Sequence, residues 1–132
     1  MTRILAVACL ILSISTAAQA DAATFSTALK DAGTAEKVSA LVEGLEGDEK
    51  GWVSWVVESG GVEGPASQLN VDGAEWTYYS TCRTHMCDEQ AIGMITNAGG
   101  DVFLKLYGSD VAGSQKILGA PPAAVEAALL AQ

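Results

Sequence analysis

The residues of this chain that could do chemistry gather in one short stretch, STCRTHMCDE, at positions 80–89. The stretch contains two of the three cysteines, Cys82 and Cys87, and between them His85, the only histidine in the sequence. Two thiols and an imidazole can bind a metal ion, exchange electrons, or close a small loop once the thiols are joined. The choice depends on the compartment of the protein, because oxidising compartments turn close cysteine pairs into disulfides.

The opening of the chain, MTRILAVACLILSISTAAQA, predicts export. A short positive end is followed by an apolar run that starts at Ile4, and the stretch closes in the small-residue site Ala18-Gln19-Ala20. This is the pattern of a cleavable signal peptide, and its apolar run is too short to span a membrane. We therefore expect a signal peptide over residues 1–20 and a periplasmic mature chain over residues 21–132, which no longer carries Cys9.

The mature chain is expected to be one acidic domain, because 112 residues (132 − 20) can build a single core and no long linker divides them. Loss of Arg3 leaves 6 basic residues against 16 acidic ones, a formal charge of −10. Nucleic acid and anionic membranes are poor partners for such a surface, whereas a basic protein is attracted to it. No oligomeric state is predicted.

The spacing of apolar residues predicts an α+β fold around the cysteine stretch. We expect a five-stranded antiparallel sheet with helices packed on one face and a disulfide-stapled loop between two of its strands. The Asp72-Gly73 pair predicts a tight hairpin turn. The expected elements are a helical segment at 24–46 that Gly33 divides, strands at 52–58, 67–71, 74–81, 91–96 and 101–107, and a final helix that starts at Pro121-Pro122.

The sequence leaves several interpretations of the loop open. A metal site would use Cys82, His85 and Cys87, but it lacks a fourth nearby Cys or His ligand. A redox pair is disfavoured because the spacing is not C-x-x-C. A purely structural disulfide contributes only about 2 kcal/mol for so small a ring. A rigid recognition loop explains the staple better, because a loop of fixed shape loses little entropy on binding.

No enzyme motif of the G-x-S-x-G, H-E-x-x-H, P-loop or C-x-x-C kind is present, so we expect a binding protein without catalytic residues, metal or cofactor. The alternative is a metal- or redox-responsive periplasmic protein that uses Cys82, His85 and Cys87. Trp52, Trp55 and Trp76 could stack on a sugar ring, although their strand positions favour packing in the core.

The loop and its surroundings resemble the Ivy family, the periplasmic inhibitors of vertebrate (c-type) lysozyme. The family's loop has the form C-K-P-H-D-C, and here it reads Cys82-Arg83-Thr84-His85-Met86-Cys87. The similar context includes Trp55-Val56, Gly60-Gly61, Pro65 and the Asp-Gly hairpin. The likeness covers roughly residues 35–130 of the chain, so it includes nearly all of the expected domain.

The resemblance implies that the loop enters the lysozyme cleft and that His85 lodges between the two catalytic carboxylates. Those two groups need different protonation states, which an imidazole between them would upset. Thr84 and Met86 replace the family's proline and aspartate, while Arg83 keeps the charge of the family's lysine. The expected partner is a c-type lysozyme or, alternatively, the cell's own lytic transglycosylases, which also use acidic catalytic groups.

Overall fold

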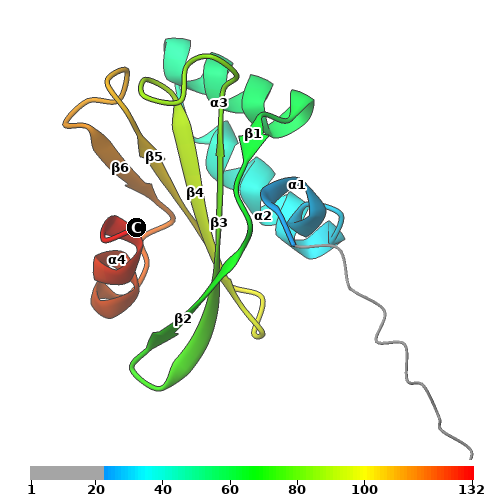
Figure 1. The fold of residues 1–132 in the computed structure, drawn as a ribbon, viewed down its shortest axis with the longest axis vertical. Coiled ribbons are helices and arrows are strands. Elements are labelled where there is room, and N and C mark those ends of the chain that lie inside the picture. Colours follow the sequence, from blue (N-terminus) through cyan, green and yellow to red (C-terminus); the bar gives the residue numbers. More distant parts are fainter. Residues whose placement is uncertain (1–22) are drawn as a thin grey trace, which may run out of the picture.

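A computed structural model describes residues 23–132, and the predicted signal peptide lies outside these residues. Figure 1 shows how the helices and strands are arranged. No helix in the described part of the chain is long and apolar enough to cross a membrane. The elements are α1 (Phe25–Ala28), α2 (Ala32–Glu43), α3 (Gly47–Ser59), β1 (Val62–Glu63), β2 (Ser67–Val71), β3 (Ala74–Cys82), β4 (Ala91–Asn97), β5 (Val102–Tyr107), β6 (Gln115–Leu118) and α4 (Ala123–Leu130).

The strands form one antiparallel sheet in the order β1-β3-β4-β5-β6, with β2 also paired to β3. Strand β4 occupies one edge of β3, so β1 and β2 follow each other along its other edge. The predicted α+β class and antiparallel sheet are confirmed. The hairpin at Asp72-Gly73 is confirmed as well: both residues have positive φ, 50° and 82°, which defines a type I′ turn.

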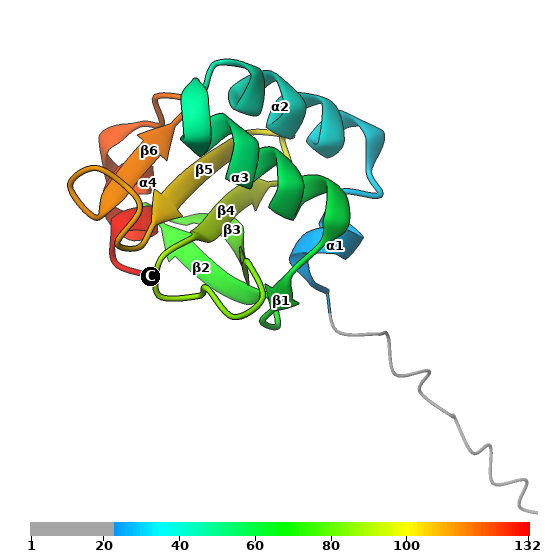
Figure 2. The same ribbon diagram turned by 90° about the horizontal axis from the view of Figure 1, so that it is seen from above.

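Helices cover both faces of the sheet, whereas the sequence predicted them on one face. Helices α1, α2 and α3 pack on the face that carries Ile92, Met94 and Leu104 (the α2–α3 face). Helix α4 packs on the opposite face (the α4 face), where Leu129 is buried with Trp76 and the neighbouring strands. Figure 2 shows the sheet between these two layers of helices, seen from above. The alternation of side chains along each strand supplies both apolar faces.

The predicted strand at 52–58 is wrong, because these residues belong to helix α3. Trp52, Val53 and Val56 are buried while Trp55 is exposed, so the buried positions follow the i, i+1, i+4 spacing of one helical face. A strand would have placed Trp52 and Val53 on opposite faces and required both to be covered. Helix α3 instead buries these three residues together, in the core on the α2–α3 face of the sheet.

The predicted helical segment 24–46 is divided into two helices, α1 and α2, but the division falls at residues 29–31 and not at Gly33. Asp31 starts α2, since its Oδ2 accepts from the main-chain N–H and the hydroxyl of Thr34, each at 2.9 Å. These bonds hold the pKa of Asp31 below its ordinary value. Gly33, expected to break the helix, lies within the first turn of α2. The sequence prediction also missed the short edge strands β1 and β6.

Candidate functional site

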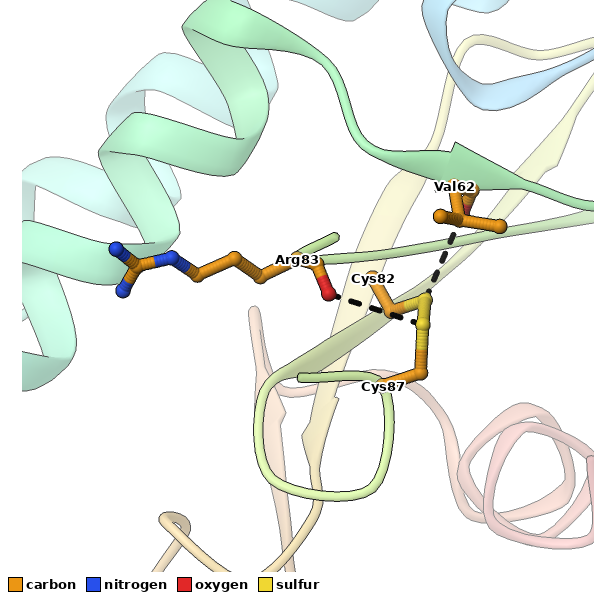
Figure 3. Close-up of a disulfide and its surroundings, with 4 residues drawn as sticks. All are labelled: Val62, Cys82, Arg83 and Cys87. Atoms are coloured by element: carbon orange, nitrogen blue, oxygen red, sulfur yellow. Dashed lines mark hydrogen bonds between the residues drawn. A yellow bond between two sulfur atoms is a disulfide. The ribbon is translucent and has the colours of Figure 1, made fainter. Parts of the chain in front are cut away.

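The Cys82–Cys87 disulfide is present in the structure and closes the loop between β3 and β4. Figure 3 shows it against β1, with Cys82 Sγ 3.7 Å from the carbonyl oxygen of Val62. Cys87 Sγ lies 3.7 Å from the carbonyl oxygen of Arg83 within the ring. Disulfide sulfurs carry no proton, so both approaches are packing contacts. The disulfide therefore packs against the main chain of β1 at the end of β3.

The tip of the loop is a β-turn of residues 83–86, in which the N–H of Met86 donates to the carbonyl of Arg83 at 2.9 Å. His85 has φ 65° and Thr84 is not among the residues with positive φ, which is the pattern of a type II turn. Both side chains are exposed. The third turn position favours glycine or asparagine, so a histidine there carries backbone strain of about 1 kcal/mol. Strain of this kind is a recurrent feature of functional sites.

The base of the loop is braced by the connection between β5 and β6. The N–H groups of Ser109 and Asp110 donate to the carbonyls of Asp88 and Glu89, at 3.0 and 3.1 Å. Gly108 contacts the carbonyl oxygen of Glu89 so closely that a Cβ at position 108 would overlap it. The base of the loop is therefore also held by main-chain hydrogen bonds that do not involve the disulfide.

Arg83 lies in the predicted binding loop, but its side chain leaves the tip and crosses to α3 (Figure 3). Its guanidinium carbon lies 5.0 Å from the centre of the Trp55 ring. Arg83 Nη1 donates to Gln90 Oε1 at 3.2 Å, and Gln90 Nε2 donates to Asp110 Oδ2 at 2.8 Å. The resulting chain of contacts joins α3, the loop and the β5–β6 connection.

A cleft of about 640 Å³ opens beside this chain of contacts, between the start of α3 and the loop. We call it the acidic cleft, because three of its lining residues are carboxylates. One of them, Glu49, is paired with Lys116 at 2.6 Å. The lining residues are Asp48, Glu49, Gly51, Trp52, Trp55, Arg83, Gln90 and Asp110.

The sequence pointed to only some of the residues that line the acidic cleft. Trp55 was noted, but the expectation that it packs in the core is wrong, since 42% of its surface is exposed. The same expectation is confirmed for Trp52 and Trp76, each 6% exposed. Gln90 and Asp110 were not predicted at all. No local pattern marks them, because their contacts join segments that lie 20 residues apart.

Two of the three ligands of the alternative metal site are bonded to each other, since the sulfurs of Cys82 and Cys87 form the disulfide. Within residues 23–132, no group of three or more His, Cys, Asp or Glu side chains is arranged to hold a metal ion.

A second polar cluster lies on the α4 face, around the buried Lys105. Lys105 is 1% exposed, and its Nζ donates to the main-chain oxygen of Gln132 at 2.7 Å. The ammonium also lies 4.7 Å from the ring centre of Tyr107 and 6.0 Å from that of Tyr78. Burial lowers the pKa of Lys105 below its ordinary value. Burial raises the pKa of Tyr78, and the neighbouring Tyr107 adds to the rise.

Comparison with known proteins assigns no family. A scan against models of known protein families finds no match, and a search among curated proteins finds none either.

Proposed function

We propose that the protein inhibits c-type lysozyme by inserting the Cys82–Cys87 loop into the active-site cleft of the enzyme. The observation that carries the proposal is the position of His85. The only imidazole of the chain is exposed at the tip of a disulfide-closed turn, on a strained left-handed backbone. The resemblance of the loop sequence to the Ivy family supports the same function.

The chemistry of the target explains why an imidazole suits the tip. Lysozymes cleave their substrate with two carboxyl groups, one that donates a proton and one that stays ionised. A protonated imidazole has two N–H donors, so His85 can bond both groups at once. Such a contact fills the space of the sugar and prevents the proton transfer that cleavage needs.

The charge of the chain supports a basic target. Residues 21–132 carry a formal charge of −10, with 6 basic and 16 acidic residues. Opposite charges accelerate encounter and disfavour acidic competitors. A strongly basic enzyme such as a c-type lysozyme fits this surface better than nucleic acid or an anionic membrane does.

The alternative, a metal- or redox-responsive protein, has weaker support. Metal binding by Cys82 and Cys87 requires free thiolates, whereas both sulfurs are joined in the structure. A thiol titration of the unreduced protein distinguishes the two functions. Two free thiols would favour the alternative and count against a rigid inhibitor loop.

Lysis of a cell-wall suspension by a c-type lysozyme tests the proposal. We expect residues 21–132 to inhibit, and His85→Asn to weaken binding by about 2 kcal/mol, roughly 30-fold, as for an interface hot spot. Asparagine is the matched replacement, because it tolerates the left-handed backbone of position 85 while removing the ring. The loss should appear mainly in the dissociation rate.

The possible results separate mechanism from target. If the parent inhibits and His85→Asn inhibits equally well, insertion of the imidazole is wrong even though the protein is an inhibitor. If neither protein inhibits any c-type lysozyme, the proposed target is wrong, and the lytic transglycosylases become the next enzymes to assay.

A further inference from the structure

We propose that the partner-binding surface continues from the loop onto α3, where Trp55 forms a second contact and the acidic cleft takes a lysine or arginine side chain of the basic partner. This inference rests on the proposed function, because it describes the same partner. It adds a site on a helix that the loop mechanism does not use.

Exposed apolar side chains are concentrated around the loop. Only three large hydrophobic residues in the described part of the chain are strongly exposed: Trp55, Val62 and Leu130. Trp55 touches the loop through Arg83, and the main chain of Val62 touches the disulfide. Figure 3 shows Val62 beside the disulfide and the Arg83 side chain running from the loop towards helix α3. Two of the three exposed residues therefore flank the predicted inhibitory loop.

Trp55 is held in position before any partner arrives. The Arg83 guanidinium lies over its ring, and that guanidinium donates a hydrogen bond to Gln90 Oε1. Gln90 is 7% exposed and is itself bonded to Asp110. An aromatic side chain with restrained neighbours loses little entropy on binding, and Trp and Arg are the residues most enriched among binding hot spots.

The charge of the acidic cleft selects a cation. Asp48, Glu49 and Asp110 supply three carboxylates, against Arg83 and the Lys116 that pairs with Glu49. Asp48 is exposed and forms no ion pair within residues 23–132. Carboxylates bind ammonium and guanidinium groups through charge-assisted hydrogen bonds.

The size and place of the acidic cleft fit a side chain of a protein partner. A volume of about 640 Å³ admits a long basic side chain and part of its neighbours. The cleft shares Arg83 with the loop, so a partner that receives the loop also brings its surface over α3. A basic enzyme carries an excess of arginine and lysine side chains on its surface.

The experiment measures binding of a c-type lysozyme to the parent and to variants in two matched pairs. Trp55→Ala is paired with Leu130→Ala, an equally exposed apolar residue on α4. Asp48→Asn is paired with Asp72→Asn, which makes the same charge change in the β2–β3 turn, where asparagine suits a positive φ. Circular dichroism and melting of each variant check that the fold is intact.

We expect Trp55→Ala to weaken binding by at least ~10-fold, and Asp48→Asn to slow association by about threefold at low salt with a smaller dependence on salt. The two control variants should stay within roughly twofold of the parent, since surface changes away from an interface have little effect. If Trp55→Ala and Asp48→Asn bind as their controls do, the inference is wrong while the His85 mechanism stands.

A parent that binds no c-type lysozyme would overturn the proposed function, and the acidic cleft would then be tested alone. Triarginine is titrated while tryptophan fluorescence is followed, because Trp55 is the exposed tryptophan. Saturable quenching at millimolar peptide that is weakened in Asp48→Asn supports a cation site. Absence of quenching in the parent overturns it.

Discussion

Thr84 stands where the tip turn of the loop most favours proline. It is the second residue of a type II turn, a position at which proline presets the required φ. The N–H of Thr84 donates no hydrogen bond within residues 23–132, so proline would remove no donor that the fold uses.

We therefore expect Thr84→Pro to raise the free energy of unfolding by about 0.5 kcal/mol and to tighten lysozyme binding, because fewer unbound loop conformations compete. Urea unfolding and calorimetry measure the two effects. Ser109→Pro is the contrasting variant, because the N–H of Ser109 does donate to Asp88, and it should destabilise the protein. A Thr84→Pro variant that unfolds more easily than the parent would contradict the type II assignment.

Some site residues could be predicted from the sequence because their relation is local. Cys82, His85 and Cys87 lie within one six-residue stretch, so spacing and compartment were sufficient for the disulfide and the exposed tip. The direction of Arg83 could not be predicted in the same way. Its partner Trp55 lies 28 positions away, 83 − 55, in a segment whose secondary structure the sequence pattern misassigned.

At the scale of elements, the misassigned helix α3 shows where apolar patterns fail. WVSWVV is rich in residues that favour strands, and a run of apolar residues shorter than about ten fits a buried strand and a buried helix equally well. The hairpin at Asp72-Gly73 was predictable because few residues adopt two positive φ values in succession. Strand β6 has exposed and half-buried residues only, so no apolar alternation marked it.

The disulfide should matter more for binding than for folding. Loss of chain restraint from so small a ring costs about 2 kcal/mol at most, which lowers the melting temperature by about 10 °C or less. Hydrogen bonds from Ser109 and Asp110 still hold the base of the loop. We expect reduced protein to unfold cooperatively but to inhibit at least ~10-fold less, because the free loop loses its preset shape.

Melting and inhibition assays with and without reductant measure both effects. The double variant Cys82→Ser, Cys87→Ser is the control: it should behave as the reduced parent does and should not respond to reductant. Equal inhibition by oxidised and reduced parent would show that the disulfide has no part in presenting the tip.

At the scale of the whole molecule, the burial of Tyr78 and Lys105 on the α4 face makes the free energy of unfolding depend on pH in the alkaline range. The pKa of Tyr78 is raised above 10.0 in the folded protein, so above pH 10 the unfolded chain releases a proton that the folded chain retains. The contribution of Tyr78 to the free energy of unfolding is therefore complete below pH 10. It is lost as pH rises further, by at most about 1.4 kcal/mol per pH unit. Tyr78→Phe should lose less stability than the parent above pH 10.

Urea unfolding at pH 8, 10 and 11 measures this difference. Lys105 acts in the opposite direction: its pKa is lowered, so its contribution to stability rises with pH up to its ordinary value of 10.5. Lys105 is present in both proteins, so the difference between parent and Tyr78→Phe isolates the phenol. A difference that stays constant from pH 8 to 11 would contradict the buried phenol.

The short separation of the two cysteines also bears on the order in which the molecule assembles. Only five positions separate Cys82 from Cys87, so their sulfurs meet through local chain motion on a timescale near 100 ns, before strands find each other. Oxidation therefore needs no sheet as a template. Once closed, the ring brings Cys82 near its ladder partner Ala91 and shortens the search for the β3–β4 register. A disulfide that is already formed when the chain folds therefore favours the β3–β4 pairing of the central hairpin.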